Sequence, residues 1–268
     1  MLTKPIPSTH EQLPVIGLGT WQTFDVDRTK HLEEVLSLFV ELGGRLVDSS
    51  PMYGRAEKVV GDLATSLALR NQLFIATKVW TRGKREGIAQ MESSEEKLRG
   101  RVDLMQVHNV VDADAHLETL RAWKAEGRVR YIGVTHYTSS GYAALETFMR
   151  RPGIDFVQLN YSIAEREAER RLLPLALELG IAVLVNRPFG EGAILRQTQT
   201  RALPAFASEL DATSWAELLL KFVVSHPAVT CAIPATSNAA HLRDNMRAGE
   251  GRMPDEAMRK KIAAALLE

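Results

Sequence analysis

Apolar residues along the chain follow two alternating spacings. From Asp25 onward, short apolar runs alternate with segments in which apolar residues recur every three or four positions. The first helical segment shows the second spacing at five positions: Leu32, Val35, Leu36, Phe39 and Val40. The spacing returns over residues 56–67, and residues 73–79 then have the pattern of a buried strand. Such alternation is typical of repeated βα units around a parallel sheet.

Eight apolar runs are predicted to be parallel strands. They span residues 15–20, 45–48, 73–79, 102–108, 129–135, 155–161, 181–188 and 229–235. Helical segments lie between them, among them residues 88–98, 172–180 and 215–226. Eight βα repeats in 268 residues predict an α/β fold, a (β/α)8 TIM barrel, formed by residues 1–268 as a single domain. Residues 3–7 and 12–15 are expected to form a short β-hairpin that closes the bottom of the barrel.

The composition narrows the class of protein. The chain has 33 Lys+Arg and 33 Asp+Glu, so its formal net charge is zero. This balance argues against a nucleic-acid partner or an anionic membrane surface. Apolar residues make up 45% of the chain, which supports a large core and excludes disorder as the main state. We expect a monomer or a weak homo-oligomer.

The amino-terminal segment and the cysteine content predict a cytoplasmic protein. Residues 1–12 lack an apolar core of signal-peptide length, and no later run has the length needed to cross a bilayer. The single cysteine, Cys231, lies in an apolar run, which predicts a buried core residue. A lone cysteine forms no internal disulfide and fits a reducing compartment.

Polar side chains stand at the ends of three consecutive predicted strands. Asp48, Lys78 and His108 occupy these positions, and Tyr53 lies in the loop after Asp48. In a barrel of this kind, the active site forms at the carboxyl ends of the strands. Each residue has a structural alternative: Asp48 as a helix cap, Lys78 in a buried ion pair, His108 as a core histidine. Their position at one end of neighbouring strands favours a shared site.

These four residues are suited to general acid catalysis, in which a side chain donates a proton to the substrate. A free tyrosine has a pKa of about 10, and we expect the ammonium of Lys78 to lower the pKa of Tyr53. Asp48 would hold Lys78 charged and in place. His108 would hydrogen-bond the oxygen of a bound carbonyl while Tyr53 supplies the proton. A positioned general acid of this type typically contributes about 10²- to 10⁴-fold in rate.

Carbonyl reduction also requires a hydride, which no side chain delivers, so a cofactor is needed. The sequence has no GxxxxGK[ST] run, and residues 17–22 carry two glycines without the third of the dinucleotide fingerprint. We therefore expect a nicotinamide nucleotide to bind across the top of the barrel.

Motifs over almost the whole chain resemble those of the aldo-keto reductase family. The most specific is LVDSSPMYGRAEKVVG at residues 46–61. The others keep the family's order: IGLGTW, IATKVW, DLMQVH, YIGVTHY, FVQLNYS, NRPFGEG and IPATSNAAHLRDN. The resemblance implies an oxidoreductase that converts aldehydes and ketones to alcohols with a nicotinamide cofactor. It places the family's catalytic tetrad at Asp48, Tyr53, Lys78 and His108, with Tyr53 as the general acid.

The resemblance also implies contacts with cofactor and substrate. Gln158 is expected to hydrogen-bond the carboxamide of the nicotinamide, and Asn186 stands where an aromatic ring often stacks. The expected cofactor contacts are Gly19, Thr20, Trp21, Asp48, Thr135, His136, Gln158, Asn186, Arg187, Pro188, Phe189, Gly190, Ala235, Thr236, Ser237, His241 and Asn245. The expected substrate contacts are Trp21, Met52, Tyr53, Trp80 and His108.

Two departures from the family pattern concern the nucleotide and the pocket. Ala235 and His241 replace the Lys and Arg that many members use on the 2′-phosphate of NADPH. We expect NADPH, with NADH as the alternative. The chain ends soon after a helix predicted from residue 253, which implies that the long closing loop of many members is missing and that the pocket is open. Residues 189–213, the longest irregular stretch, are expected to line part of it.

Two other classes of protein remain open. One is a nucleotide-binding regulatory subunit of the same fold with weak catalysis, which the lack of an added interaction domain disfavours. The other is a metal-dependent hydrolase with Asp48, His108 and His136 as ligands. The chain has no His-x-His or HExxH spacing, and Lys78 would place a positive charge beside the metal, so we expect no bound metal.

Overall fold

The computed structural model describes residues 1–27 and 29–267, and a ring of eight parallel strands lies at its centre. The strands are β3 (Leu18–Gly19), β4 (Leu46–Asp48), β5 (Phe74–Val79), β6 (Leu104–His108), β7 (Tyr131–Thr135), β8 (Phe156–Asn160), β9 (Ala182–Asn186) and β10 (Val229–Ala232). Neighbours in the ring follow one another in sequence. Parallel bridges from Ile16 to Ala232 and from Gly19 to Ala235 join the first strand to the last. The predicted (β/α)8 barrel is confirmed.

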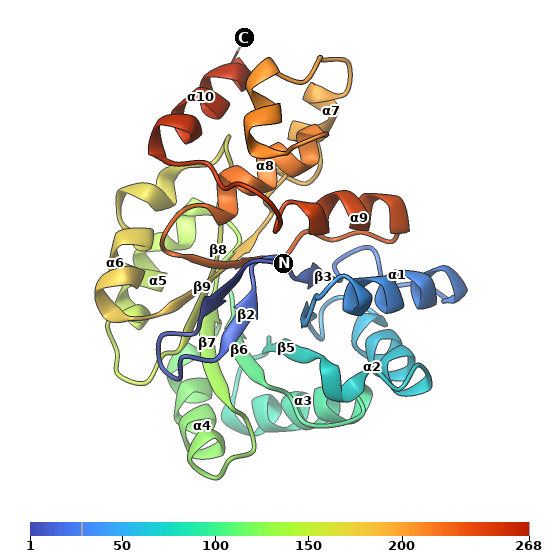
Figure 1. Ribbon diagram of the computed structural model, residues 1–268. Coiled ribbons are helices and arrows are strands. Elements are labelled where there is room, and N and C mark those ends of the chain that lie inside the picture. The colour runs from blue at the N-terminus through green and yellow to red at the C-terminus, as the bar shows by residue number, and fades with distance from the viewer. Residues whose placement is uncertain (28, 268) are drawn as a thin grey trace.

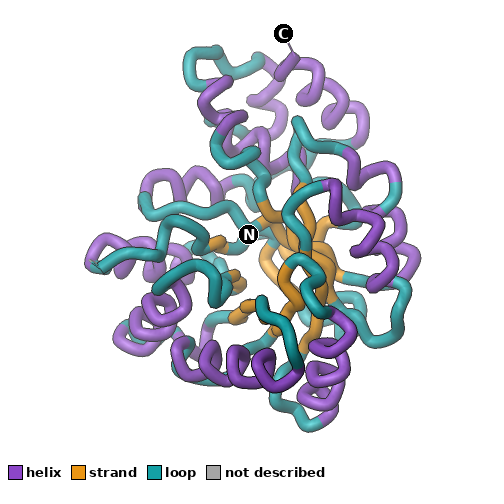
Figure 2. Tube along the Cα trace, turned by 180° about the vertical axis from the view of Figure 1, so that it is seen from behind, coloured by secondary structure: helices purple, strands orange, loops and turns teal. Residues whose placement is uncertain are grey.

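Helices cover the outside of the barrel, as Figures 1 and 2 show from opposite sides. The α-helices are α1 (Lys30–Glu41), α2 (Ala56–Ser66), α3 (Lys84–Lys97), α4 (Ala113–Ala125), α5 (Tyr142–Met149), α6 (Leu172–Leu179), α7 (Ala193–Thr198), α8 (Trp215–Val224), α9 (Ala239–Arg247) and α10 (Glu256–Leu267). Short 3-10 helices are η1 (Arg70–Gln72), η2 (Ser139–Gly141), η3 (Glu167–Arg170) and η4 (Ala205–Leu210). Each barrel strand is followed by at least one helix, so the predicted βα repeat holds.

Two stretches differ from their predicted structure. Helix α3 begins at Lys84, four residues before the predicted start, because its first turn is polar and adds nothing to the apolar periodicity. The stretch 189–213, predicted to be irregular, contains α7 and η4. Each of these helices has only six residues, which is too short for an apolar repeat to reveal it.

The barrel interior changes from apolar to polar along its axis. Its apolar layer is one buried cluster: Ile6, Leu13, Leu46, Phe74, Ala76, Leu104, Tyr131, Phe156, Ala182, Leu184, Cys231 and Ile233. Side chains two residues apart on a strand share a face. The inward positions that follow this layer are polar: Asp48 after Leu46, Lys78 after Ala76, Gln106 and His108 after Leu104, and Gln158 and Asn160 after Phe156. The predicted burial of Cys231 is confirmed.

A hairpin of β1 (Thr3–Pro5) and β2 (Gln12–Pro14) seals the apolar end, as predicted. Figure 1 shows it in dark blue in front of the barrel strands. Ile6 and Leu13 from this segment are fully buried in the interior cluster. At its edge, the Tyr131 hydroxyl donates to Glu11 at 2.7 Å, and Arg130 pairs with both Glu11 and Asp103. The opposite end of the barrel is therefore the one that remains accessible.

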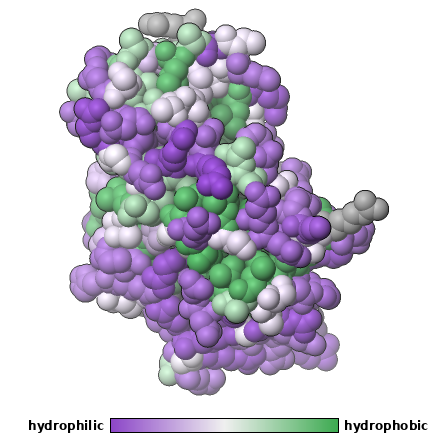
Figure 3. All heavy atoms as spheres, turned by 45° about the vertical axis from the view of Figure 1, so that its right-hand side comes forward, coloured by the Kyte–Doolittle hydropathy of each residue, from purple (hydrophilic) through white to green (hydrophobic). Residues whose placement is uncertain are grey.

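The outer surface is largely polar. Figure 3 shows one face on which polar side chains surround smaller groups of apolar ones. Among residues 1–27 and 29–267, no helix combines the length and the apolar character that crossing a bilayer requires.

Candidate active site

A buried ion pair lies at the carboxyl end of the barrel. Lys78, on β5, is fully buried, and its Nζ donates to Asp48 Oδ2 and to the carbonyl oxygen of Ser49, each at 2.6 Å. Burial alone disfavours the ammonium, but the attraction of Asp48 and Tyr53 outweighs this effect and raises the pKa of Lys78 above its ordinary value. Lys78 is therefore a fixed positive charge at the end of the strand ring.

Tyr53 lies beside this charge. The Lys78 Nζ is 4.9 Å from the centroid of the Tyr53 ring. Burial raises the pKa of the Tyr53 phenol above its ordinary value, and the Lys78 ammonium offsets only part of that rise. The expected lowering of this pKa is therefore wrong, because the loss of solvent around the phenolate outweighs the attraction of one ammonium. Tyr53 keeps its proton at neutral pH.

His108, at the end of β6, lies between two aromatic rings. Its centroid is 6.0 Å from that of Tyr53, edge to face, and 6.3 Å from that of Trp80. Burial and the nearby charge of Lys78 lower the pKa of His108 to about 2, so the imidazole is neutral. Its Nδ1 is 3.1 Å from Ser50 Oγ, which also accepts from the Met52 N–H. With the Ser50 hydroxyl donating to Nδ1, the ring proton sits on Nε2.

The second oxygen of Asp48 is held by two glutamines. Gln158 Nε2 donates to Asp48 Oδ1 at 2.9 Å, and Gln106 Nε2 donates to it at 3.3 Å. Gln158 is expected to face a carboxamide; its amide nitrogen donates to Asp48, and its Oε1 lies 3.4 Å from the Thr135 hydroxyl. Gln106 was missed, although it lies two residues before His108 and so on the same strand face. Both glutamines fix the carboxylate that holds Lys78.

Two buried oxygens near this network have no donor among the described residues. They are Oδ1 of Asn160 and Oδ1 of Asn186, at the ends of β8 and β9. An unpaired buried acceptor is costly, so these atoms favour a ligand that donates hydrogen bonds. The carboxamide nitrogen of a nicotinamide is such a donor. The residues at this position therefore fit a nicotinamide, and Asn160 joins the expected contacts.

The turn before α9, at one side of the same end, is capped by its own side chains. Asn238 Oδ1 accepts from the N–H groups of Ala240 and His241, and Thr236 Oγ1 accepts from the Asn238 N–H. The sequence reading did not identify Asn238 as the cap of α9. Ala235 and His241 are exposed, Ser237 is partly exposed, and Asn245 is buried in α9. The start of α9, with the partly exposed Ser237 hydroxyl beside it, is the positive end of a helix dipole and suits a phosphate group.

Other predicted cofactor residues have partners of their own. Thr20 is fully buried, and its hydroxyl donates to the Asp48 carbonyl at 2.9 Å. Arg187 donates to the carbonyl of Tyr137 at 2.9 Å and lies 3.4 Å from a carboxylate oxygen of Glu191. Thr135 is buried beside Gln158. Pro188, Phe189 and Gly190 follow Arg187 in the loop after β9.

Gly19 and the rim residues shape the mouth. A Cβ at Gly19 would lie 2.7 Å from the Ile233 carbonyl oxygen, so only glycine fits where the first and last strands meet. Trp21, Met52 and Trp80 are each about two-fifths exposed despite their apolar side chains. Exposed large apolar residues beside a polar site are typical of a binding surface.

The arrangement does not support the hydrolase interpretation. Among the residues that the structure describes, no three His, Cys, Asp or Glu side chains form a group that could hold a metal ion. Asp48 is occupied by Lys78, and the ring of His136 stacks on Tyr137, with centroids 5.6 Å apart.

The fold and the site together define a parallel barrel that carries a Lys-Asp-Tyr-His cluster at its carboxyl end. The family model of the aldo/keto reductase family matches residues 15–265. The chain belongs to the aldo/keto reductase family.

Several known proteins are similar to this chain. It is 32% identical over 247 residues to methylglyoxal reductase YeaE from Escherichia coli, a match covering 87% of this chain and 84% of that protein. It is 27% identical over 233 residues to an NADH-specific methylglyoxal reductase from the same organism, covering 74% and 70%. The structure of an aldo/keto reductase from Klebsiella pneumoniae, in complex with NADP and acetate, matches with a TM-score of 0.80 and 25% identity, covering 96% and 93%.

Proposed function

We propose that this chain reduces aldehydes and ketones to alcohols, with NADPH as hydride donor and Tyr53 as general acid. The convergence of Tyr53, the buried Lys78–Asp48 pair and neutral His108 at one end of the barrel carries this proposal. The names of the two methylglyoxal reductases support a small carbonyl compound as substrate. The rim of Trp21, Met52 and Trp80 supplies the apolar wall.

Each polar residue has one task in this reaction. When bound, the reduced nicotinamide supplies the hydride to the carbonyl carbon. His108 donates a hydrogen bond from Nε2 to the carbonyl oxygen and orients it. Tyr53 transfers its phenolic proton to that oxygen as negative charge develops there, and solvent later restores the proton. Lys78 stabilises the phenolate left on Tyr53, and Asp48 keeps Lys78 charged and in position.

The residues that would hold the nucleotide lie around the strand ends. Asn160, Asn186 and Gln158 offer amide groups to the carboxamide. The Ser237 hydroxyl and the positive dipole end of α9 lie where a phosphate would bind. NADPH remains our proposal, with NADH as the alternative, since one similar protein is named NADH-specific.

The test is tryptophan fluorescence of the purified protein titrated with NADPH and then with NADH, followed by turnover on a panel of aldehydes and ketones. Trp21 and Trp80 lie at the rim, so we expect saturable quenching and oxidation of the bound nucleotide when a carbonyl is added. Tight binding with negligible turnover on every carbonyl would indicate a regulatory subunit instead. No binding of either nucleotide would contradict the proposal.

A further inference from the structure

A small cavity adjoins the proposed carbonyl position. It has a volume of about 280 Å³ and is lined by Trp80, Thr81, Arg82 and Val111. Trp80 belongs to both places, because it lines this cavity and its ring centroid is 6.3 Å from that of His108. The cavity therefore lies beside the position proposed for the substrate carbonyl.

Arg82, whose side chain is exposed, is the one cationic residue that lines the cavity. In the described part of the chain, no carboxylate lies within salt-bridge distance of its guanidinium, and no hydrogen bond to it is present. The two neighbouring cations do have partners: Lys84 pairs with Glu118, and Arg85 pairs with Glu86. An arginine without a counter-ion beside a cavity next to the site is available for an anionic ligand.

The loop that carries Val111, which also lines the cavity, is held in an unusual conformation. After His108, Asn109 and Val110 have φ angles of 52° and 50°, in the left-handed region that a β-branched residue such as Val110 rarely adopts. Asp112, whose φ is 49°, accepts a hydrogen bond from the Gly83 N–H at 2.7 Å. This contact ties the Val111 wall to the segment that carries Arg82.

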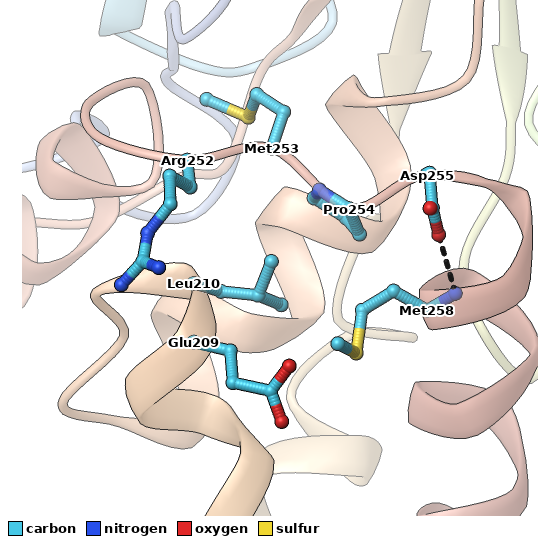
Figure 4. Close-up of a pocket in the computed structure, with 7 residues that line it drawn as sticks. All are labelled: Glu209, Leu210, Arg252, Met253, Pro254, Asp255 and Met258. Carbon is cyan, nitrogen blue, oxygen red and sulfur yellow. Dashed lines mark hydrogen bonds between the residues drawn. The ribbon is translucent and has the colours of Figure 1, made fainter.

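Another cavity, shown in Figure 4, provides a contrast. It has a volume of about 340 Å³ and lies between η4 and the segment before α10. Its arginine, Arg252, donates to Asp211 Oδ1 at 3.0 Å, and Asp255 accepts from the Met258 N–H at 2.8 Å. These groups stabilise the fold, so this cavity offers no unpaired cation to a ligand.

We propose that the site prefers carbonyl substrates that carry a carboxylate, with Arg82 binding the carboxylate and Trp80 packing along the chain between the two groups. This inference rests on the proposed reductase function and names a class of substrate for it. The guanidinium fork matches the two oxygens of a carboxylate, and the cavity accepts a short chain. The carbonyl end remains with His108 and Tyr53.

The test compares succinic semialdehyde with its uncharged methyl ester at fixed NADPH. We expect kcat/KM for the acid to exceed that for the ester by about tenfold or more, because one charge-assisted contact strengthens substrate binding by this factor. The difference should appear as a lower KM for the acid. In Arg82→Gln this ratio should fall to near one, and high salt should reduce it in the unsubstituted protein. The matched control is Arg85→Gln, since Arg85 is a neighbouring cation already paired with Glu86; it should keep the ratio.

The outcomes separate this inference from the function on which it rests. Equal kcat/KM for acid and ester in the unsubstituted protein would overturn only the carboxylate preference. A fall of the same proportion for both substrates in Arg82→Gln would show a structural role for Arg82 and would also overturn it. If neither aldehyde is reduced while other carbonyls are also inert, the reductase proposal fails and this inference fails with it.

Discussion

The two ends of the barrel use charged groups in opposite ways. At the amino end, Arg130 lies between Glu11 and Asp103, and the Tyr131 hydroxyl donates to Glu11 above a fully apolar layer. The hairpin segment supplies Glu11 to this network, whose side chains are partly exposed. At the carboxyl end, Lys78 and Asp48 form a fully buried pair, and no hairpin covers it.

The difference between the ends lies in what is left unpaired. The amino-end charges form a closed set of partners, so they hold the hairpin in place. The carboxyl end leaves the Asn160 and Asn186 oxygens without donors and keeps Trp21 and Trp80 exposed. A fold tolerates such groups at a site where a ligand completes them. A tyrosine with cationic and acidic neighbours therefore stabilises the fold at one end and serves chemistry at the other.

Substitution of Tyr53 should abolish most of the catalytic activity of the carboxyl end without unfolding the protein. In Tyr53→Phe, kcat should fall about 10²- to 10⁴-fold because the general acid is lost. The melting temperature should change little, because Lys78, the neighbour of the hydroxyl, keeps its contacts to Asp48 and Ser49 without it. Steady-state kinetics with NADPH and thermal unfolding measure both effects. Retention of kcat would contradict the role of Tyr53.

Removal of Lys78 should damage both stability and activity. In Lys78→Met, the Asp48 carboxylate remains buried without its cation, and the free energy of unfolding should fall by about 3 to 5 kcal/mol. Urea unfolding measures this loss. The control is Lys84→Met, whose exposed pair with Glu118 should contribute less than about 1 kcal/mol. Equal effects of the two substitutions would mean that the burial of Lys78 is not decisive.

The neutral His108 predicts a pH dependence of stability. Its pKa is about 2 in the folded protein and about 6.5 in an unfolded chain, so unfolding takes up a proton below pH 6.5. The contribution is fully present above pH 6.5 and should fall by about 1.4 kcal/mol for each pH unit below about pH 6. Urea unfolding of His108→Gln between pH 6 and pH 4 should lack this component. The same slope in both proteins would show that His108 does not titrate in this way.

Substitution at the amino end should affect stability alone. Glu11→Gln weakens the contacts to Arg130 and Tyr131 at the barrel edge, which should cost about 1 kcal/mol of unfolding free energy. No change in kcat is expected, because the hairpin lies at the end opposite Tyr53. Thermal unfolding and steady-state kinetics on one preparation test this. A fall in kcat with unchanged stability would contradict the separation of the two ends.

Much of the fold could be predicted because the spacing of apolar residues along the chain differs between strands and helices. The strand and helix repeat identified eight βα units, and the polar strand ends indicated Asp48, Lys78 and His108. The boundaries of short elements could not be predicted: β3 covers only Leu18–Gly19 of the run 15–20, because the barrel closes there through single bridges. A periodic pattern becomes visible only over several residues, and an element as short as β3 does not contain enough of them.

The residues of the site could be predicted from the sequence, but the direction of the Tyr53 pKa shift could not. The sequence placed Lys78 near Tyr53 and so suggested a lowered pKa, but the degree of burial that raises it is a tertiary property. Gln106 and Asn238 act through side-chain contacts across the fold or within a turn, which residue type alone does not reveal. Arg82 stands out only in the structure, where no described residue forms a salt bridge or hydrogen bond with its guanidinium.

The central claim, that the carboxyl end reduces a carbonyl with a nicotinamide nucleotide, is tested most directly by a single turnover. The unsubstituted protein in excess is mixed with NADPH and methylglyoxal, and both nucleotide oxidation and product are quantified. We predict one molecule of alcohol for each NADPH oxidised. NADPH that binds to saturation and stays reduced in the presence of the carbonyl would contradict the claim.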